Sequence, residues 1–159
     1  MSNIKNINEL AAIRNELKLQ NKKVVFTNGV FDILHAGHVD YLTKAKSKGD
    51  ILIIAVNSDS SVKKIKGELR PIVPQNERAI IISSLKPVDY VVLFDEETPY
   101  EIIKKIIPDV LVKGADWSVK NIVGRDIVEA AGGKVETIEF INDNSTTNII
   151  KTVLERFKK

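Results

Sequence analysis

The segment Ile51–Asn57 constrains the fold more than any other part of the chain. It reads ILIIAVN, so its first six residues are apolar, without the alternation that marks a half-exposed strand. Unbroken apolar runs of this length are typical of strands in a parallel sheet that helices cover on both faces. A chain with such a strand therefore needs helices on either side of a central sheet.

Four further segments have the character of strands, and helical signals separate all five. The other expected strands are Lys23–Thr27, Val88–Phe94, Asp109–Val112 and Val135–Phe140. Helices are expected at Asn6–Leu19, Gly37–Ala45, Asn76–Leu85 and Ile122–Ala131, from Thr98-Pro99 to just before Pro108, and in a C-terminal segment capped by Ser145. This alternation predicts a doubly wound, Rossmann-like α/β domain with a five-stranded parallel sheet and helices on both faces. The domain would occupy residues 21–159, after an N-terminal helix in residues 1–20.

Composition narrows the class of protein. The chain has no cysteine, which excludes disulfides, thiolate metal sites and cysteine nucleophiles. No apolar run approaches the roughly 20 residues of a membrane-spanning helix, and residues 1–8 lack the apolar core of a secretory signal. We therefore expect a cytoplasmic protein without a membrane partner. The net charge of +3 comes without a long basic run or a stacking pattern of aromatic residues, so no nucleic-acid partner is expected either.

Residues with chemical potential gather after the expected strands, where doubly wound sheets bind their ligands. The segment Thr27–His38 reads TNGVFDILHAGH and contains both histidines of the chain. His35 and His38 are three residues apart at the start of a helix, so their side chains share one face of its first turn, beside N–H groups that favour an anion. Gly29 is free to take a positive φ after the strand, and Gly37 lets a phosphate approach the backbone. We interpret this segment as a phosphate cradle.

Simpler explanations exist for these residues. Two surface histidines that cap a helix would have the same spacing. No metal site is expected, because no third ligand accompanies the pair. The polar segment Ser58–Val73, expected to be a loop or an irregular helix, contains Lys63, Lys64 and Lys66. It is either a solvated charged loop or the carrier of one lysine that closes over a triphosphate.

The cradle resembles the nucleotidyltransferase superfamily that carries the H-x-G-H motif, which His35–His38 match in full. Further motifs follow in the order of that family. They are Asn57-Ser58-Asp59, Lys66-Gly67, Arg70-Pro71, Glu77-Arg78-Ala79, Lys113-Gly114-Ala115-Asp116 and Ser145-Thr146-Thr147, which opens the last helix. The resemblance covers nearly the whole chain, from Lys22 to Lys159, and is nearest to the adenylyltransferase domains of ADP-heptose synthases. Many of those have a sugar-kinase domain in front, so a stand-alone transferase is expected here.

The resemblance implies an activity. It is transfer of AMP from ATP, with Mg²⁺ on the triphosphate, to D-glycero-D-manno-heptose 1-phosphate, giving ADP-heptose and pyrophosphate. It also implies a homodimer. Related glycerol-3-phosphate cytidylyltransferases carry an arginine-led stretch before the serine-threonine pair, and Phe140–Asn144 has no arginine. The alternatives are CTP with glycerol 3-phosphate, another small phosphate ester as acceptor, and a nucleotide-binding module without turnover.

The same resemblance implies roles for individual residues. His35 and His38 would hold the triphosphate, and Lys66 would act as a mobile clamp, which makes these three the expected catalytic residues. Nucleotide contacts are expected from Thr27, Asn28, Gly29, Phe31, Gly37, Asn57, Arg78, Lys113, Gly114, Ser145, Thr146 and Thr147. Acceptor contacts are expected from Asp32, Asp116 and Trp117. The simpler alternatives are that Asp32 only fixes its loop, that Arg78 is an ordinary surface residue, that Trp117 is plain core, and that Ser145–Thr147 only cap a helix. Trp117 could also be a surface on which the base stacks.

Overall fold

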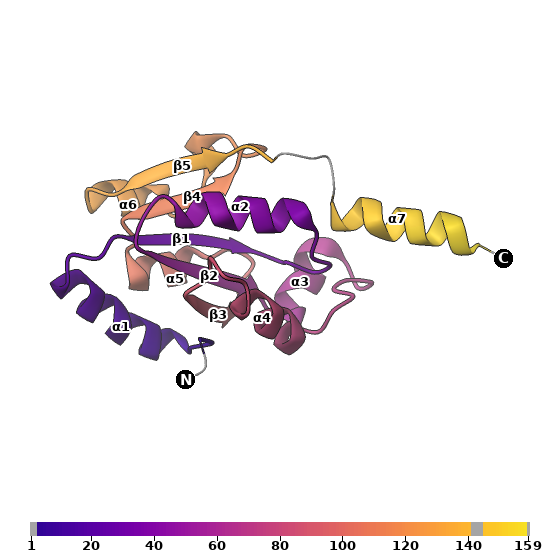
Figure 1. The fold of residues 1–159 in the computed structure, drawn as a ribbon, viewed down its shortest axis with the longest axis horizontal. Helices are drawn as coiled ribbons and strands as arrows, with labels where there is room; N and C mark the ends of the chain where they lie inside the picture. Colours follow the sequence, from indigo (N-terminus) through magenta and orange to yellow (C-terminus); the bar gives the residue numbers. More distant parts are fainter. Residues whose placement is uncertain (1–2, 141–144, 159) are drawn as a thin grey trace.

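The structure, a computed structural model, describes residues 3–140 and 145–158 (Figure 1). These residues form a five-stranded parallel sheet with the strand order β3-β2-β1-β4-β5. The strands are β1 (Val24–Gly29), β2 (Ile51–Asn57), β3 (Tyr90–Phe94), β4 (Val110–Gly114) and β5 (Lys134–Ile138). The expected doubly wound sheet is confirmed, and its strand order reverses between β1 and β4.

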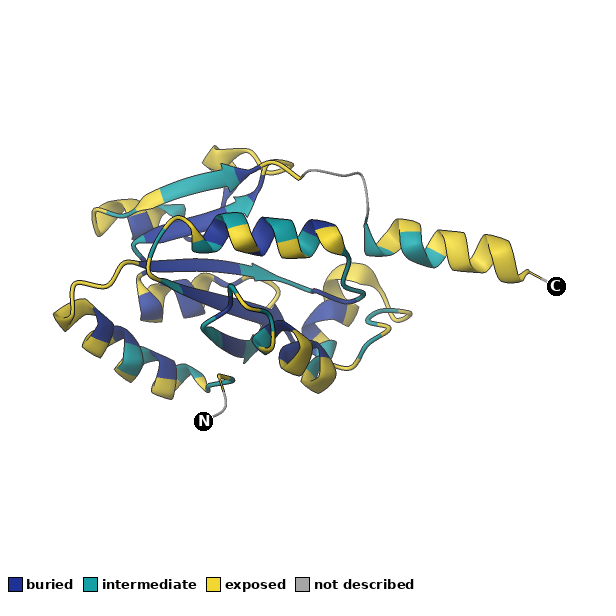
Figure 2. Cartoon of the chain, viewed as in Figure 1, coloured by how far each residue is buried: buried dark blue, intermediate teal, exposed yellow. Residues whose placement is uncertain are grey.

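Helices cover both faces of the sheet. They are α1 (Ile7–Leu19), α2 (Ala36–Lys46), α3 (Asp59–Lys66), α4 (Gln75–Ser83), α5 (Tyr100–Ile106), α6 (Arg125–Ala130) and α7 (Thr146–Phe157), with a 3-10 turn at Val119–Asn121. The core on one face contains side chains of α2 and α4, and the core on the other contains side chains of α1, α5 and α6. Successive side chains of a strand point to opposite faces, so β2 places Ile54 in the first core and Ile53 in the second. Burial on both faces explains its unbroken apolar run (Figure 2).

The reversal of strand order opens the sheet at one edge. β1 pairs with β2 along its whole length, as far as Gly29. With β4 it pairs only at Val25 and Phe26. The carboxyl ends of β1 and β4 are therefore not bridged by backbone hydrogen bonds, and such a crevice is where doubly wound proteins bind ligands.

The polar segment after β2 differs from the expected loop or irregular helix. Asp59–Lys66 form the regular helix α3, and the Ser58 hydroxyl caps it by accepting a hydrogen bond from Ser61 N. Gly67 follows with φ 91°. Only Ser61 and Val62 of this helix are buried. Its only apolar residues are Val62 and Ile65, which are too few to identify a helix by periodicity alone.

Two other helix boundaries differ from the expected ones. Pro99, not Thr98, occupies the cap position of α5, and the helix begins at Tyr100. The helix expected at Ile122–Ala131 begins only at Arg125, because a 3-10 turn and Gly124, with φ 85°, precede it. By contrast, α1 begins directly after Asn6, where the expected helix starts, and Asn6 and Glu9 form a capping box with both of its hydrogen bonds.

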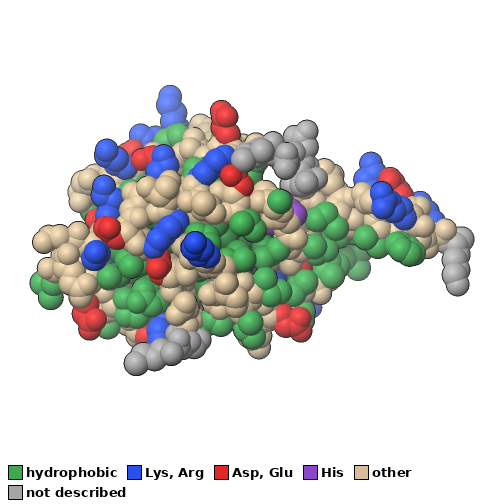
Figure 3. Space-filling model, viewed as in Figure 1, with side chains coloured by type: hydrophobic (Ala, Val, Ile, Leu, Met, Phe, Trp, Pro, Cys, Tyr) green, Lys and Arg blue, Asp and Glu red, His purple; other side chains and the backbone are tan. Residues whose placement is uncertain are grey.

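The two terminal helices are held in different ways. α1 buries Leu10 and Leu17 in the second core. α7 buries none of its described residues and projects beyond the body of the molecule (Figures 1 and 2). Its Leu154 and Phe157 side chains are 60% and 78% exposed, and hydrophobic side chains follow one side of this helix in Figure 3.

Candidate functional site

Two adjoining cavities lie at the carboxyl edge of the sheet. The larger, of about 370 Å³, contains Lys66, and we call it the Lys66 cavity; its lining is Asn28, Gly29, Val30, Asn57, Ile65, Lys66, Glu97, Thr98, Pro99, Lys113, Trp117 and Val123. The smaller, of about 170 Å³, contains His38, and we call it the His38 cavity; its lining is Asn28, Gly29, Val30, Phe31, His38, Tyr41, Lys113, Gly114, Asp116, Trp117 and Phe140. The residues that line both are Asn28, Gly29, Val30, Lys113 and Trp117, so the two cavities share a wall built from the ends of β1 and β4.

Close packing of the Phe31 ring shapes the end of β1. A Cβ at Gly29 would lie 2.9 Å from the Phe31 ring. Gly29 does not adopt a positive φ, and Phe31 does instead, with φ 49°. The expectation that Gly29 takes a positive φ is therefore wrong. A glycine is needed at this strand end because a side chain there would collide with the buried Phe31 ring. A Cβ at Gly37 would likewise lie 3.0 Å from His35 Nδ1, so this glycine leaves space for the imidazole.

The two histidines form a contacting pair at the start of α2. Their ring centroids are 3.9 Å apart, and His35 N donates a hydrogen bond of 3.4 Å to His38 Nδ1. This bond leaves the His38 proton on Nε2, which makes that atom a donor. Burial, with the charge of His35 as a second cause, lowers the pKa of His38 to about 4, and burial lowers the pKa of His35. Both rings are therefore neutral donors near pH 7.

His35 has one unused polar atom at this place. Its Nδ1 is buried and has no hydrogen-bond partner among the residues that the structure describes. The Oδ1 atom of Asn28, a residue that lines both cavities, is likewise buried without a hydrogen-bond partner among the described residues. Buried polar atoms are almost always paired, and an exception requires a reason. Two exceptions at one sheet edge fit a site that binds a polar ligand.

Asp32 is fully engaged by the segment before α4. It is 3% exposed and accepts hydrogen bonds from Arg70 Nε at 2.6 Å, Ile72 N at 2.9 Å and Val73 N at 2.8 Å. Burial alone would raise its pKa, but the hydrogen bonds from the two backbone amides and the Arg70 guanidinium outweigh burial and lower the pKa. Both carboxylate oxygens are used inside the protein. This geometry favours the alternative that Asp32 fixes its loop over the expected contact with the acceptor.

Arg78 is also engaged inside the protein. It is 1% exposed, and its guanidinium donates to Val30 O at 2.6 Å, Asp59 Oδ1 at 2.8 Å and Val73 O at 2.9 Å. The alternative of an ordinary surface residue is wrong. The expected contact with the nucleotide stays a prediction, and the geometry favours a role in holding the ends of β1 and β2 together.

Three further side chains expected at the site line the cavities. Lys66 is exposed on the last turn of α3 and forms no ion pair among the described residues, whereas Lys63 lies 3.9 Å from Glu68. Lys113 Nζ lies 5.6 Å from the centroid of the Trp117 ring. Burial, opposed by the charge of Asp116, lowers the pKa of Lys113 to about 8. Trp117 is 48% exposed, so the alternative that it is plain core is wrong.

The start of α7 is attached beside the histidine segment. Thr146 Oγ1 donates to Ile33 O at 3.0 Å, and Ser145 Oγ caps the helix by accepting from Asn148 N. The helix-capping role of Ser145 is confirmed. The absence of an arginine from Phe140–Asn144 was the reason to expect ATP rather than CTP. Only Phe140 of this stretch is among the described residues. The Phe140 ring stacks on Tyr41, with centroids 5.3 Å apart.

Ten expected site residues line the cavities and eight do not. Those that do are Asn28, Gly29, Phe31, His38, Asn57, Lys66, Lys113, Gly114, Asp116 and Trp117. Those that do not are Thr27, Asp32, His35, Gly37, Arg78, Ser145, Thr146 and Thr147. Thr27 is buried, and its hydroxyl is 2.8 Å from that of Tyr41.

The cavity linings also contain residues that we did not expect at the site. They are Val30, Tyr41, Ile65, Glu97, Thr98, Pro99, Val123 and Phe140. For Glu97–Pro99 a signal existed, because they follow the carboxyl end of β3, but the Thr98-Pro99 pair was interpreted only as a helix start. For the apolar members, nothing in the sequence separates a cavity wall from core.

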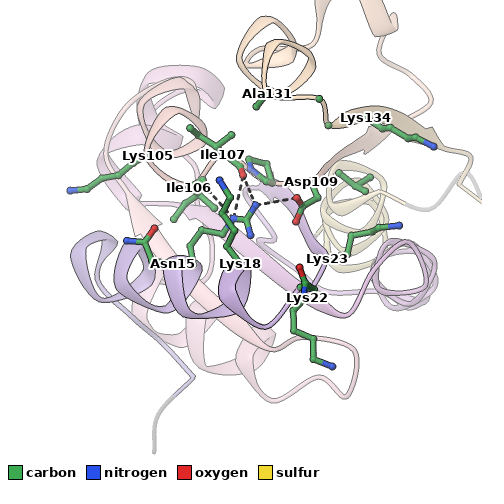
Figure 4. A pocket seen from close by; sticks show the side chains of 16 residues that line it. Asn15, Lys18, Lys22, Lys23, Lys105, Ile106, Ile107, Asp109, Ala131 and Lys134 are labelled. Carbon is green, nitrogen blue, oxygen red and sulfur yellow. Dashed lines mark hydrogen bonds and ion pairs between the residues drawn. The ribbon is translucent and has the colours of Figure 1, made fainter.

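A third hollow, of about 570 Å³, lies at the opposite edge of the sheet (Figure 4). Lys18, Lys22, Lys23, Lys105 and Lys134 line it, and buried Arg14 binds the carbonyl oxygens of Ile106 and Ile107 and the carboxylate of Asp109 there. Helices α1, α5 and α6 end at this hollow, and lysines at helix C-termini offset the negative ends of the helix dipoles. We therefore do not regard it as the candidate site.

Two further properties bear on the class of site. No helix in residues 3–140 or 145–158 combines the length and the apolar composition needed to cross a membrane. Within the same residues, no group of three or more histidine, cysteine, aspartate or glutamate side chains is arranged to hold a metal ion.

Comparisons with known proteins cover most of the chain. The model of the family described as cytidylyltransferase-like matches residues 26–153. The bifunctional protein HldE of Citrifermentans bemidjiense is 51% identical over 156 residues, which is 98% of this chain and 32% of that protein. The HldE of Aliarcobacter butzleri is 53% identical over 157 residues, again 32% of its length. The chain thus spans about a third of the length of these curated relatives.

Solved structures agree in fold. The lipopolysaccharide core biosynthesis protein of Thermoplasma volcanium superimposes with a TM-score of 0.62 at 31% identity, over 77% of this chain and 99% of that chain. The pantoate-beta-alanine ligase of Francisella tularensis superimposes with a TM-score of 0.61 at 16% identity, over 91% of this chain and 68% of that chain. The second likeness concerns the fold alone.

We expect His35→Ala and His38→Ala each to lower kcat about a hundredfold and to leave the protein folded. A positioned donor to charge that develops in a transition state is worth roughly 10²–10³ in rate. The double variant should lose less than the product of the single losses, because both donors serve one charge. Steady-state kinetics and thermal unfolding of the three variants measure this. Lost stability with near-normal turnover would instead favour the helix-capping explanation.

We expect Lys66→Ala to lower kcat at least tenfold while the thermal midpoint barely moves. The side chain is exposed at a cavity and contributes nothing to either core. A side chain that meets phosphates only when the site closes affects mainly kcat. Lys63→Ala and Lys64→Ala are matched controls on the same helix. Full activity of Lys66→Ala together with loss in either control would show that a different lysine acts.

We expect Asp32→Asn to lower the free energy of unfolding by about 3 kcal/mol, since it leaves a partly buried arginine without its partner. The amide keeps one oxygen acceptor where the carboxylate had two, so its NH2 group faces either the Arg70 guanidinium or the Ile72 and Val73 N–H groups, donor against donor. Urea unfolding at pH 7 measures the loss, and Asp116→Asn, at an exposed carboxylate of the same edge, is the control. Unchanged stability with a raised KM for the acceptor would restore Asp32 to acceptor binding.

Proposed function

Because the chain belongs to the cytidylyltransferase-like family, we propose that it transfers the AMP part of ATP to a sugar 1-phosphate and releases pyrophosphate. The observation that carries this proposal is the shared wall of the His38 cavity and the Lys66 cavity. A direct transfer between two bound substrates requires two sites that meet. Here they meet at Lys113, a cation with no acidic hydrogen-bond or ion-pair partner among the described residues.

The proposed reaction is one in-line displacement. An oxygen of the acceptor phosphate forms a bond to the α-phosphorus of ATP, and the bond from that phosphorus to the bridging oxygen of the pyrophosphate group breaks. The acceptor oxygen is already ionised, so no side chain has to act as nucleophile. The protein contributes positioning and fixed donors for the negative charge that builds up. The neutral His35 and His38 rings would supply N–H donors, and Lys66 and Lys113 would supply positive charge.

Mg²⁺ belongs to this proposal as a companion of the ATP phosphates. It binds most often through substrate phosphates together with one or two carboxylates. Asp116 lines the His38 cavity and is the carboxylate available to it there. When bound, the ion would neutralise charge on the departing pyrophosphate.

Heptose 1-phosphate is the acceptor that we propose. It is supported by the motif set, which resembles the adenylyltransferase domains of ADP-heptose synthases, and by identity near 50% to proteins named bifunctional protein HldE. The relative from Thermoplasma volcanium, whose description concerns lipopolysaccharide core biosynthesis, is in keeping with a sugar substrate. The homodimer, the cytoplasmic location and the lack of a nucleic-acid partner stay predictions.

We expect ATP with heptose 1-phosphate to give the highest kcat/KM in a matrix of ATP and CTP against heptose 1-phosphate and glycerol 3-phosphate. Pyrophosphate release measures turnover. The missing arginine before Ser145 is the reason to expect little turnover of CTP with glycerol 3-phosphate. The His38→Ala variant controls for contaminating activity. A preference for the CTP pair would overturn the assignment of substrates, and nucleotide binding without pyrophosphate release would favour a module without turnover.

A further inference from the structure

The proposed function leaves open which cavity takes which substrate and what recognises the sugar. We propose that the Lys66 cavity is the acceptor site and that Glu97 and Thr98, which follow β3, bind the hydroxyl groups of the sugar. This inference rests on the proposed function and adds to it two residues that no motif singles out. It concerns a ligand with two parts, an anionic phosphate and a neutral face rich in hydroxyl groups.

The first step is to decide where the nucleotide lies. The donors suited to a triphosphate, His38 and the N–H groups at the start of α2, lie on the side of the His38 cavity. The start of α7 lies on the same side, because Thr146 binds Ile33 O two residues before His35. The Lys66 cavity is on the other side of the wall formed by Lys113 and Trp117. If the nucleotide occupies the histidine side, the Lys66 cavity remains for the acceptor.

The second step concerns the chemistry of the Lys66 cavity. Its lining combines the cations Lys66 and Lys113 with one carboxylate, that of Glu97. A carboxylate repels phosphate but accepts hydrogen bonds from hydroxyl groups. A ligand that is anionic throughout would therefore be disfavoured, whereas one with a phosphate and several hydroxyl groups satisfies both kinds of side chain. The exposed Trp117 ring adds an apolar surface on which the C–H face of a sugar can pack.

The third step is that the structure holds Glu97 close to the helix that carries Lys66. Ser61 Oγ of α3 donates a hydrogen bond of 2.6 Å to Glu96 O, and Asn57 Nδ2 donates to Ser61 Oγ at 2.9 Å. The chain next to Glu97 is thus tied through α3 to the end of β2. The Glu97 side chain itself forms no hydrogen bond or ion pair with any other described residue. It is anchored at its backbone and free at its carboxylate, as a recognition residue should be.

The decisive variant is Glu97→Gln, which keeps the size of the side chain and removes its charge. We expect a rise of about tenfold in KM for heptose 1-phosphate, with KM for ATP unchanged within twofold and most of kcat retained. Thr98→Val should show the same pattern more weakly. Glu96→Gln is the matched control, since its side chain does not line the cavity, and it should leave both KM values unchanged.

Calorimetric binding of heptose 1-phosphate to wild-type protein and to Glu97→Gln, without ATP, separates this proposal from the proposed function. Tenfold weaker binding by the variant supports the sugar site even if no transfer occurs. Turnover by wild-type protein with both KM values unaltered in Glu97→Gln overturns the sugar site and leaves the function standing. A selective rise in KM for ATP in Glu97→Gln would instead assign the nucleotide to the Lys66 cavity. This result would also overturn the sugar site. If wild-type protein shows no binding and no turnover, the sugar site and the proposed function are both overturned.

Discussion

The buried carboxylate of Asp32 is the interaction on which the arrangement of the site depends. Asp32 belongs to the segment after β1, and its partners Arg70, Ile72 and Val73 belong to the segment between α3 and α4. Arg78 reinforces this attachment from the next helix, since it binds both Val30 O and Val73 O. A buried charge is tolerated only with its partners in place. The polar network therefore fixes how the end of α3, with Lys66, lies relative to the histidine segment.

The histidines and the lysines contribute differently to the electrostatics of the site. Protonated imidazoles packed 3.9 Å apart would repel each other, and their burial would add a desolvation cost. The pair instead stays neutral near pH 7 and offers oriented N–H donors. Positive charge comes from Lys66 and Lys113, on separate elements. Burial of Lys113 without an acidic hydrogen-bond partner lowers its pKa to about 8, and an anion bound beside it would stabilise its charged form.

The sequence predicts those parts of the fold that repeat locally, and it misses those that depend on distant partners. Apolar runs such as Ile51–Val56 identify the strands, because a strand that is buried on both faces has apolar side chains on both. The H-x-G-H spacing locates the histidine pair for a similar reason, since one helical turn fixes the geometry. The partners of Asp32 lie about 40 residues away in the chain, and no local pattern distinguishes a buried carboxylate from one that binds ligand. Helix α3 was expected only as a loop or an irregular helix, because it buries only Ser61 and Val62.

The polarity of the sheet explains why the chain has lysines at both of its edges and why only one edge is a candidate site. In a parallel sheet with connecting helices, helix N-termini lie at the carboxyl edge of the strands and helix C-termini at the other. At the carboxyl edge, the N–H groups that begin α2 add to the effect of nearby lysines on an anion. At the opposite edge, the lysines around Arg14 and Asp109 offset the negative ends of α1, α5 and α6 (Figure 4). A net charge of +3 therefore says little about anion binding until each cation is placed relative to the helix ends.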